Sequence, residues 1–313
     1  MKKFTLSLIF LSFLFSTANA QKVVDKVFKA KETVTISTVR GDCIIKKGND
    51  NEIKVHLSYT YDDDCFNPVF NEETDVLEIK EKFDGNCRGE SKWAITLPAN
   101  TIIKFNSASG DVEITDVIKS TYVNTASGDI KLSNLKGDIK LNSASGDVSI
   151  NTINANLKIN TASGDVDAHK LEGKIKINTA SGDIDIKNAN AALKANSASG
   201  EIEAENIVVN GKSSFNTASG DVEVSLAKSS AYDLTLSSAS GDVTLNYNGN
   251  DLSGFYEFTA RVKKGRIISP VKFDKEEVIE KNGKKYDVKS FNKGNSSPII
   301  LIKTSSGTAK LIK

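Results

Sequence analysis

The chain has 313 residues, of which 26% are charged and 39% are hydrophobic, with 41 Lys and Arg against 40 Asp and Glu. This composition excludes a disordered chain and is typical of a folded protein with a substantial core. The balanced charge excludes a basic surface built to bind nucleic acid phosphates, and two histidines are little material for a metal site or an acid–base pair.

The first twenty residues resemble a secretory signal. Lys2 and Lys3 precede an apolar run over residues 6–15, and the segment ending at Ala20 has the small-x-small pattern of a cleavage site. The run is shorter than the about 20 apolar residues that span a bilayer. We therefore predict a signal peptide over residues 1–20 and an exported mature chain without a membrane span, in the periplasm, on the outer surface or outside the cell. Loss of the two lysines leaves 39 basic and 40 acidic side chains.

Residues 21–105 are predicted to form an N-terminal β cap with one degenerate coil and an insertion. The degenerate coil ends at Gly41-Asp42 and places Cys43 at an inward position, which predicts a buried thiol. Cys65 and Cys87 both fall in the irregular stretch 58–92, outside any repeat. Since export permits disulfides, we predict that these two cysteines pair and staple the insertion.

A hexad Asn-Ser-Ala-Ser-Gly-Asp at residues 106–111 recurs along the chain. Its glycines lie 18 residues apart and later 20 and 21 apart, at Gly110, Gly128, Gly146, Gly164, Gly182, Gly200, Gly220 and Gly241. Gly137 and Gly173 lie midway between successive copies. This half-period predicts two turns and two short strands in each unit, and it assigns regular repeats to residues 106–268.

Side chains alternate along each predicted strand, so that Leu157 and Ile159 point inward while Lys158 and Asn160 point outward. A single unit cannot close a core, but units stacked about 4.8 Å apart bury a continuous apolar column. The sequence therefore predicts an all-β fold, a parallel two-sheet β-solenoid with coils of about 18 residues. The crossover rule favours right-handed winding.

Residues 269–313 are predicted to contain an insertion and a capping coil that ends with a last copy of the turn at Gly307. Aromatic residues concentrate towards both ends of the chain, where they can cover an exposed end of the core. They are Phe66, Phe70, Phe83 and Trp93 at one end and Phe255, Tyr256, Phe258, Phe273, Tyr286 and Phe291 at the other. Atypical terminal coils protect a solenoid from pairing with other chains.

The run of Ser-Gly-Asp-Val/Ile turns, together with Trp93-Ala-Ile-Thr-Leu-Pro98 before the first full repeat, resembles the bacterial adhesin-like domain family DUF4097. The resemblance covers roughly residues 30–313. It implies a β-solenoid exported to the bacterial envelope, and it implies no catalytic residues.

The repeated acidic residue of the turn is the strongest candidate for chemistry. We expect a column along one edge formed by Asp111, Asp129, Asp147, Asp165, Asp183, Glu201, Asp221 and Asp242. Neighbouring carboxylates repel each other, and calcium, which prefers oxygen ligands, would relieve the repulsion. The alternative is that each carboxylate accepts backbone N–H groups of a turn. The sequence supports no metal site beyond this hypothesis and no other cofactor.

Outward strand positions carry opposite charges on the two sheets. Before the turn they hold Lys104, Lys140, Lys158, Lys176 and Lys194, and after it they hold Glu113, Asp167, Asp185, Glu203 and Glu223. Such faces keep a repetitive sheet soluble, or they favour side-by-side packing or binding of a charged polymer. Two further columns are expected to be structural: the asparagines from Asn106 onwards and the inward hydroxyls at positions 107, 125, 143, 161, 179, 197 and 217.

An enzyme of this fold needs long loops to form a cleft, and only residues 58–92 and 270–298 could supply them. His56 and His169 lie at outward positions without an evident partner. We therefore predict a non-catalytic, adhesin-like structural or interaction protein of the cell envelope. Its expected partners are an envelope or extracellular protein or glycan surface, or a second copy of the chain. A calcium-binding solenoid is the alternative, and a carbohydrate-active β-helix enzyme is a distant one.

Overall fold

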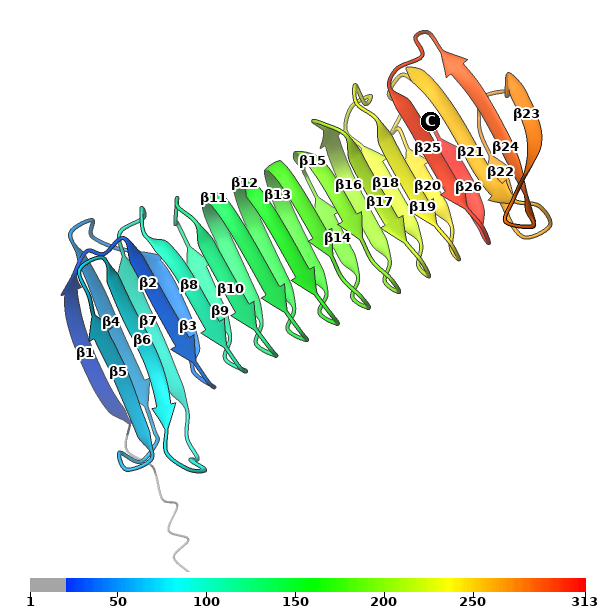
Figure 1. Cartoon of the computed structure of the whole chain (residues 1–313). Helices are drawn as coiled ribbons and strands as arrows, with labels where there is room; N and C mark the ends of the chain where they lie inside the picture. The colour runs from blue at the N-terminus through cyan, green and yellow to red at the C-terminus, as the bar shows by residue number, and fades with distance from the viewer. Residues whose placement is uncertain (1–20) are drawn as a thin grey trace, which may run out of the picture.

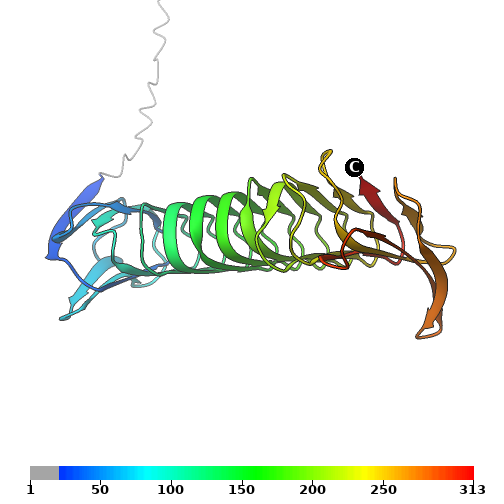
Figure 2. The ribbon, with the colours of Figure 1, turned by 90° about the horizontal axis from the view of Figure 1, so that it is seen from above.

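The computed structural model of this chain describes residues 21–313 and shows one elongated stack of β-coils (Figure 1). The prediction of an all-β solenoid is confirmed: these residues form 26 strands. The predicted signal peptide lies outside the described residues. Residues 21–313 include no helix long and apolar enough to cross a membrane. The long straight middle of the rod separates two wider ends (Figure 2).

Each regular coil contributes one strand to each of two sheets. Sheet A contains the strands that lead into the Ser-Gly-Asp turn and the strands that extend this sheet at both ends. In order along the axis these are β5 (Phe66–Glu72), β6 (Val76–Phe83), β2 (Thr33–Thr38), β8 (Ile102–Ser107), β10 (Thr121–Thr125), the second halves of β11 (Ile130–Ser143), β12 (Val148–Thr161) and β13 (Val166–Asn178), then β15 (Asn190–Asn196), β17 (Ser213–Thr217), β19 (Leu234–Ser238), β25 (Ile299–Thr304), β21 (Gly254–Arg261), β24 (Lys284–Lys293) and β23 (Lys275–Lys281).

Sheet B contains the strands that leave the turn and the strands that extend this sheet at its ends. Along the axis these are β1 (Lys22–Lys29), β4 (Glu52–Tyr59), β7 (Ser91–Leu97), β3 (Asp42–Lys47), β9 (Val112–Thr115), the first halves of β11, β12 and β13, then β14 (Ile184–Lys187), β16 (Ile202–Val209), β18 (Val222–Leu226), β20 (Val243–Asn246), β26 (Thr308–Ile312) and β22 (Arg266–Ile268).

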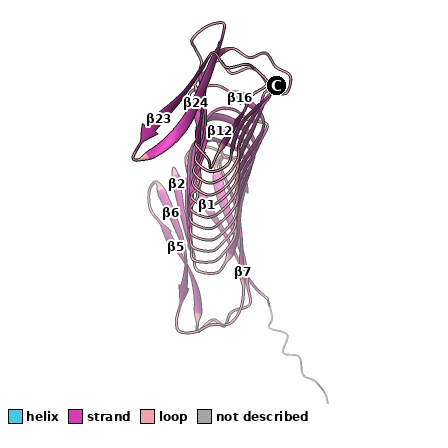
Figure 3. Cartoon of the chain, turned by 90° about the vertical axis from the view of Figure 1, so that its right-hand side faces the viewer, coloured by secondary structure: helices cyan, strands magenta, loops and turns pink. Residues whose placement is uncertain are grey.

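Equivalent residues of neighbouring coils stack directly on each other. Ile159 pairs with Ile177, and Lys158 pairs with Lys176, in a parallel register that repeats every 18 residues. Inward side chains such as Ile159 and Ile177 are fully buried and belong to one continuous hydrophobic cluster. Seen from one end, the coils superpose in a narrow, flattened cross-section (Figure 3). The period of the sequence therefore sets both the core and the surface of the rod.

The second bend of each coil differs from the prediction. The sequence placed it at Gly137 and Gly173, but it begins three residues earlier, at residues with left-handed backbone conformation. These are Asp116, Asn134, Thr152, Lys170, Asn188 and Asn206, with φ between 54° and 62°. Asn and Asp adopt this conformation more readily than other non-glycine residues. This position is not occupied by Asn or Asp in every coil, because Thr152 and Lys170 stand there in two of them, so the bend is hard to recognise in the sequence.

At both ends the order of coils along the axis differs from their order in the chain. The first coil, β2 and β3, lies between β6–β7 and β8–β9. The last coil, β25 and β26, lies between β19–β20 and β21–β22. The expectation that the C-terminal coil caps the rod is thus wrong: β21 and β22 and the hairpin β23–β24 lie beyond it. The parallel prediction also fails at the two ends, where β1–β4–β7, β5–β6 and β21–β24–β23 pair antiparallel.

The aromatic residues close the two ends of the core as expected. At the N-terminal end the ring centroids of Phe66 and Phe83 lie 5.1 Å apart, and at the C-terminal end those of Tyr256 and Phe291 lie 4.6 Å apart. Cys43 is free and buried, as predicted, and burial raises the pKa of its thiol. Cys65 and Cys87 form a disulfide with their Cα atoms 5.9 Å apart.

Candidate interaction surfaces

The glycines of the Ser-Gly-Asp turn form a column in which backbones of neighbouring coils lie unusually close. An added Cβ at Gly164 would lie 2.7 Å from the carbonyl carbon of Gly146 and closer still to its oxygen. The same short distance to the backbone carbonyl of the preceding turn glycine recurs along the column. It is found from Gly110, which lies against Gly41, to Gly307, which lies against Gly241. None of these glycines has a positive φ. They are required because no side chain fits between the coils, and not because the turn needs a special conformation.

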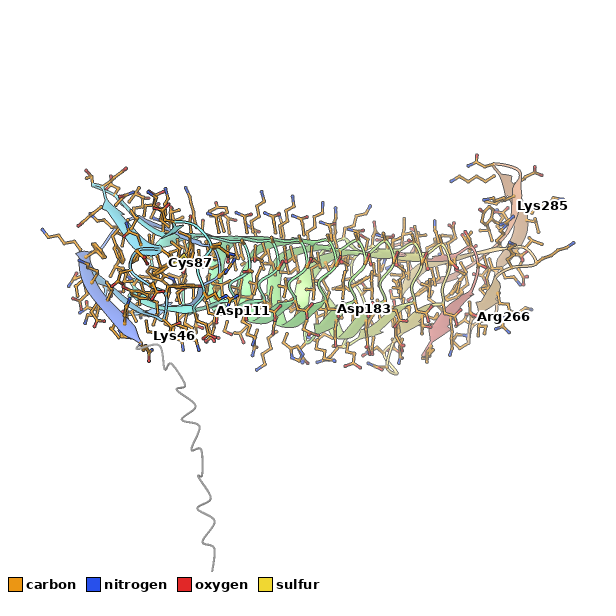
Figure 4. The ribbon with its side chains drawn as sticks, turned by 90° about the horizontal axis from the view of Figure 1, so that it is seen from below. Lys46, Cys87, Asp111, Asp183, Arg266 and Lys285 are labelled. Carbon is orange, nitrogen blue, oxygen red and sulfur yellow. A yellow bond between two sulfur atoms is a disulfide. The ribbon has the colours of Figure 1, made fainter. Side chains whose placement is uncertain are left out.

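Each turn aspartate accepts a hydrogen bond from the next coil. Oδ1 of Asp147 accepts the N–H of Asp165 at 2.9 Å, and Oδ1 of Asp165 accepts that of Asp183 at 2.8 Å. Equivalent bonds run from Asp42 to Glu201 and resume from Asp221 to Thr308. Four such bonds lead from Asp111 to Asp183, and these two residues are labelled in Figure 4. One oxygen of each of these carboxylates is therefore committed to the backbone, which favours the structural role of the column.

We expect calcium to leave the midpoint of thermal unfolding of the mature chain unchanged relative to a chelator. Within residues 21–313 no group of three or more potential metal ligands comes together. Thermal unfolding followed by circular dichroism, with and without calcium, tests this expectation. A large rise with calcium that disappears in the double variant Asp147→Asn, Asp165→Asn would contradict it and support the calcium-binding alternative.

At the N-terminal end of the column, Glu81 takes the place of another turn. Its Oε2 accepts the N–H groups of Val39 at 2.7 Å, Arg40 at 3.2 Å and Gly41 at 3.3 Å, and its Oε1 accepts the indole N–H of Trp93 at 2.9 Å. The hydroxyl of Ser91 also donates to Oε1. Glu81 is 8% exposed. This buried carboxylate therefore ends the stack of turns by satisfying the N–H groups that a further coil would otherwise meet.

The two expected polar columns are present, with different bonding. Asparagine side chains form a ladder between coils, in which Nδ2 of Asn160 donates to Oδ1 of Asn142 at 2.9 Å; its steps join Asn106, Asn124, Asn142, Asn160, Asn178, Asn196 and Asn216. The hydroxyls mostly act within their own turn, as Thr161 accepts the N–H of Gly164 at 3.0 Å. Both columns are parts of the scaffold.

The outer surface of sheet A carries a row of lysines that we call the lysine face. Lys140, Lys158, Lys176 and Lys194 pair in register on adjacent coils, about 4.8 Å apart. Tyr122 separates them from Lys104. The row is part of the predicted basic surface, and Lys174 and Lys212, which were not predicted, lie beside it and belong to the lysine face.

The outer surface of sheet B carries the carboxylate face. Asp167, Asp185, Glu203 and Glu223 pair in register on four adjacent coils. Lys131 and Ser149 interrupt the row before Glu113, which the sequence analysis had included. Asp185 is paired with Lys187 at 2.6 Å. The pKa of Glu203 is raised from its usual value, mainly by desolvation and then by Asp185 and Glu205.

Replacing Glu203 with glutamine is expected to stabilise the fold slightly at neutral pH. A carboxyl whose folded pKa is raised favours folding below its unfolded pKa, about 4.3, and loses that benefit as the pH rises through its folded pKa. Screening at this exposed site limits the gain at pH 7 to about 0.5 kcal/mol. Thermal unfolding at pH 7 and pH 4 tests this.

The control is Glu113→Gln, because Glu113 lies 3.6 Å from the ammonium of Lys46 and not among acids. We expect no stabilisation from that change. A lower midpoint for Glu203→Gln at pH 7 than for the wild type would refute the prediction.

A groove of about 670 Å³ follows the second bend over several coils. Its lining includes Leu135, Ile153 and Leu171 next to polar residues such as Asn134 and Asn188. Among the described residues that line it, Glu172 is the one carboxylate, and it accepts a hydrogen bond from Asn154 at 2.7 Å. The groove thus offers no pair of carboxylates for acid–base hydrolysis of a glycan.

The comparison with protein families decides the identity of the fold. A model of the family described as Toastrack DUF4097 matches residues 16–174 and 169–265. The chain belongs to the Toastrack DUF4097 family. No curated protein matches this Toastrack chain.

Several solved structures are similar to the Toastrack chain over nearly their whole length. A candidate adhesin from Bacteroides fragilis is 16% identical, with a TM-score of 0.35, covering 94% of this chain and 99% of that one. A candidate lipid-binding protein from Parabacteroides distasonis is 14% identical, with a TM-score of 0.42, covering 95% and 98%. A candidate adhesin from the same organism is 14% identical, with a TM-score of 0.39, covering 93% and 97%.

Sequence analysis of the Toastrack chain missed three features of these surfaces. The prediction that His56 lacks a partner is wrong, because its Nδ1 lies 2.7 Å from Oδ1 of Asp25 on the neighbouring strand β1. The role of Glu81 was missed because a single residue outside the repeat leaves no periodic signal. The lysines at 174 and 212 were missed because the residue type does not repeat along their column, in which Asp138, Asn156, Lys174 and Ala192 follow each other in register.

Proposed function

We propose that this Toastrack chain is an exported, non-catalytic protein of the cell envelope that works by adhesin-like interaction through its regular charged faces. The observation that carries the proposal is the presence of two charged rows in register on opposite sheets of a capped rod, one of lysines and one of carboxylates. A rigid rod of this kind presents several equivalent groups at once, so weak contacts add along its length. The secretory pattern of residues 1–20 supports export.

Two measurements on the native protein test the proposal. Mass spectrometry of the protein from fractionated cells is expected to find it outside the cytoplasm with Gln21 as its first residue. The purified mature chain is expected to bind isolated cell envelopes of the producing organism. Binding should weaken between about 0.1 and 1 M salt, as the screening length falls from about 10 to about 3 Å.

A cytoplasmic protein that retains Met1 would overturn the proposal of export. Envelope binding that does not change with salt would overturn the role of the charged faces. Turnover of a glycan that is lost on replacing one loop carboxylate would instead support the distant enzyme alternative.

A further inference from the structure

The lysine face contains a depression of about 300 Å³ at Ala192, where the outward side chain is short. Lys174, Lys176, Lys194 and Lys212 surround it, and Ile175 and Ala192 lie at its base. Ala192 pairs with Lys174 of the preceding coil, and Gly211 of the following coil lies against it. The short side chain of Ala192 leaves space between the lysines, which a longer residue at this position would fill.

The positive charge around this depression has little compensation from the chain itself. Within residues 21–313, Lys174, Lys176 and Lys194 make no ion pair, and the ammonium of Lys212 lies 4.0 Å from Asp233. Two further acids lie nearby on the same sheet, and each accepts a hydrogen bond from an asparagine: Glu172, two residues before Lys174 on β13, from Asn154, and Asp138, two coils from Lys174, from Asn156. Ammonium groups on adjacent coils repel each other, so an external anion is the group that relieves them.

The spacing of the lysines points to a chain of anions. Lys140, Lys158, Lys176 and Lys194 follow each other at about 4.8 Å, which is comparable to the length of one sugar in an extended chain. A linear polymer with an acidic group on every sugar would therefore place one anion near each lysine while it runs along the axis. The depression admits one acidic group more deeply than the rest of the row.

The carboxylate face of a second copy has the same spacing and is the competing partner. One of its four carboxylates, Asp185, is already neutralised by Lys187. A stable contact between two flat sheets would also require their shapes to be complementary over a large area. The exposed ion pairs between them would contribute little individually and could not replace that complementarity. A thin polymer needs no such match, and the observations favour it.

The geometry points to the lysine face as a binding site for a linear anionic polysaccharide, with an acidic group of the polymer seated between Lys174, Lys176, Lys194 and Lys212. This inference rests on the proposed function and names the partner class of one of its faces. Attraction at several equivalent lysines gives binding that depends strongly on salt.

The test measures binding of the purified mature chain to sodium polygalacturonate, which carries one carboxylate on every sugar, with neutral dextran as the reference polymer. We expect binding of the acidic polymer at low salt and none of dextran. Replacing the four lysines of the depression with glutamine should weaken binding about tenfold and reduce its salt dependence. The matched control replaces four exposed lysines of the C-terminal hairpin region with glutamine, at Lys281, Lys284, Lys285 and Lys293, and should change affinity less than about twofold.

A single change provides an independent arm. Ala192→Glu places a carboxylate among the four lysines and should reduce affinity, whereas Ala192→Gln, of nearly equal size, should reduce it less. Circular dichroism and the thermal midpoint verify that each variant is folded. Equal loss from both Ala192 variants, equal loss from the two lysine sets, or no binding by the wild type would overturn the inference.

Two further outcomes separate this inference from its alternatives. Self-association that the lysine variant abolishes, without polymer binding, would assign the face to a second copy and overturn the inference. Polymer binding by a protein that fractionation finds in the cytoplasm would contradict the proposed export and leave the lysine site supported.

Discussion

Replacing Gly164 with alanine is expected to lower the free energy of unfolding by about 3 kcal/mol, at the upper end of the usual cost of overpacking. The added Cβ would lie 2.7 Å from the carbonyl carbon of Gly146, which is backbone and cannot rotate away. Relief requires the two coils to separate at the turn, and this weakens neighbouring bonds such as that between Asp147 and Asp165. Denaturant unfolding followed by circular dichroism measures the loss.

The matched control for this prediction is Ser163→Ala in the same turn. Ser163 is exposed, and its backbone N–H, which bonds to the carbonyl of Ala144, is retained. We expect that change to cost less than about 0.5 kcal/mol. A cost for Gly164→Ala as small as that of the control would show that the turn column tolerates side chains, against the packing described here.

Replacing Glu81 with glutamine is expected to cost about 3 kcal/mol. The side chain keeps its size, but an NH2 group replaces one oxygen, and both oxygens of Glu81 face donors. The backbone N–H groups of Val39, Arg40 and Gly41 lie on one side, and the hydroxyl of Ser91 and the indole N–H of Trp93 lie on the other. Some of these buried donors then lose their acceptor. The loss falls on the N-terminal cap, so the cap is expected to open before the regular coils.

Tryptophan fluorescence reports on unfolding of the N-terminal cap, since Trp93 is the one tryptophan of the chain and is 1% exposed. In Glu81→Gln the tryptophan transition should occur at lower denaturant than the circular dichroism transition. The control is Glu78→Gln on the same strand, where the carboxylate is half-buried and bonded to Lys80 and Asn71. A tryptophan transition unchanged from the wild type in Glu81→Gln would show that Glu81 does not hold the cap.

Much of the solenoid could be predicted because its information is periodic. The 18-residue spacing fixes which residues stack, so the buried column at Ile159 and Ile177 and the ladder at Asn142 and Asn160 both follow from it. The lysine row and most of the carboxylate row follow in the same way. The break of the lysine row at Tyr122 and that of the carboxylate row at Lys131 and Ser149 were not predicted, because the period alone does not show whether every coil carries the same charge.

The features that could not be predicted are those that occur once. The insertion of the first and last coils between others depends on contacts more than 60 residues apart, such as that of Asp242 with Thr308, and no period marks them. The role of the turn glycines needs distances between coils, since their φ values are ordinary. The depression at Ala192 arises from the packing of three successive coils, which a single position does not reveal.

The placement of the terminal strands gives the rod different resistance to a pulling force at its two ends. At the C-terminus, β26 lies between β20 and β22, and β25 lies between β19 and β21, so tension must shear strands that are bonded on both sides. At the other end, β1 is bonded to β4 alone among the strands of residues 21–313, and it exposes Val23 and Val27. Tension there peels one edge strand, bond by bond, before it reaches β2. If the rod is attached to a surface through its C-terminal end, we therefore expect it to resist the force without unfolding. If it is attached through its N-terminal end, we expect β1 to detach and the attachment to lengthen under the same force.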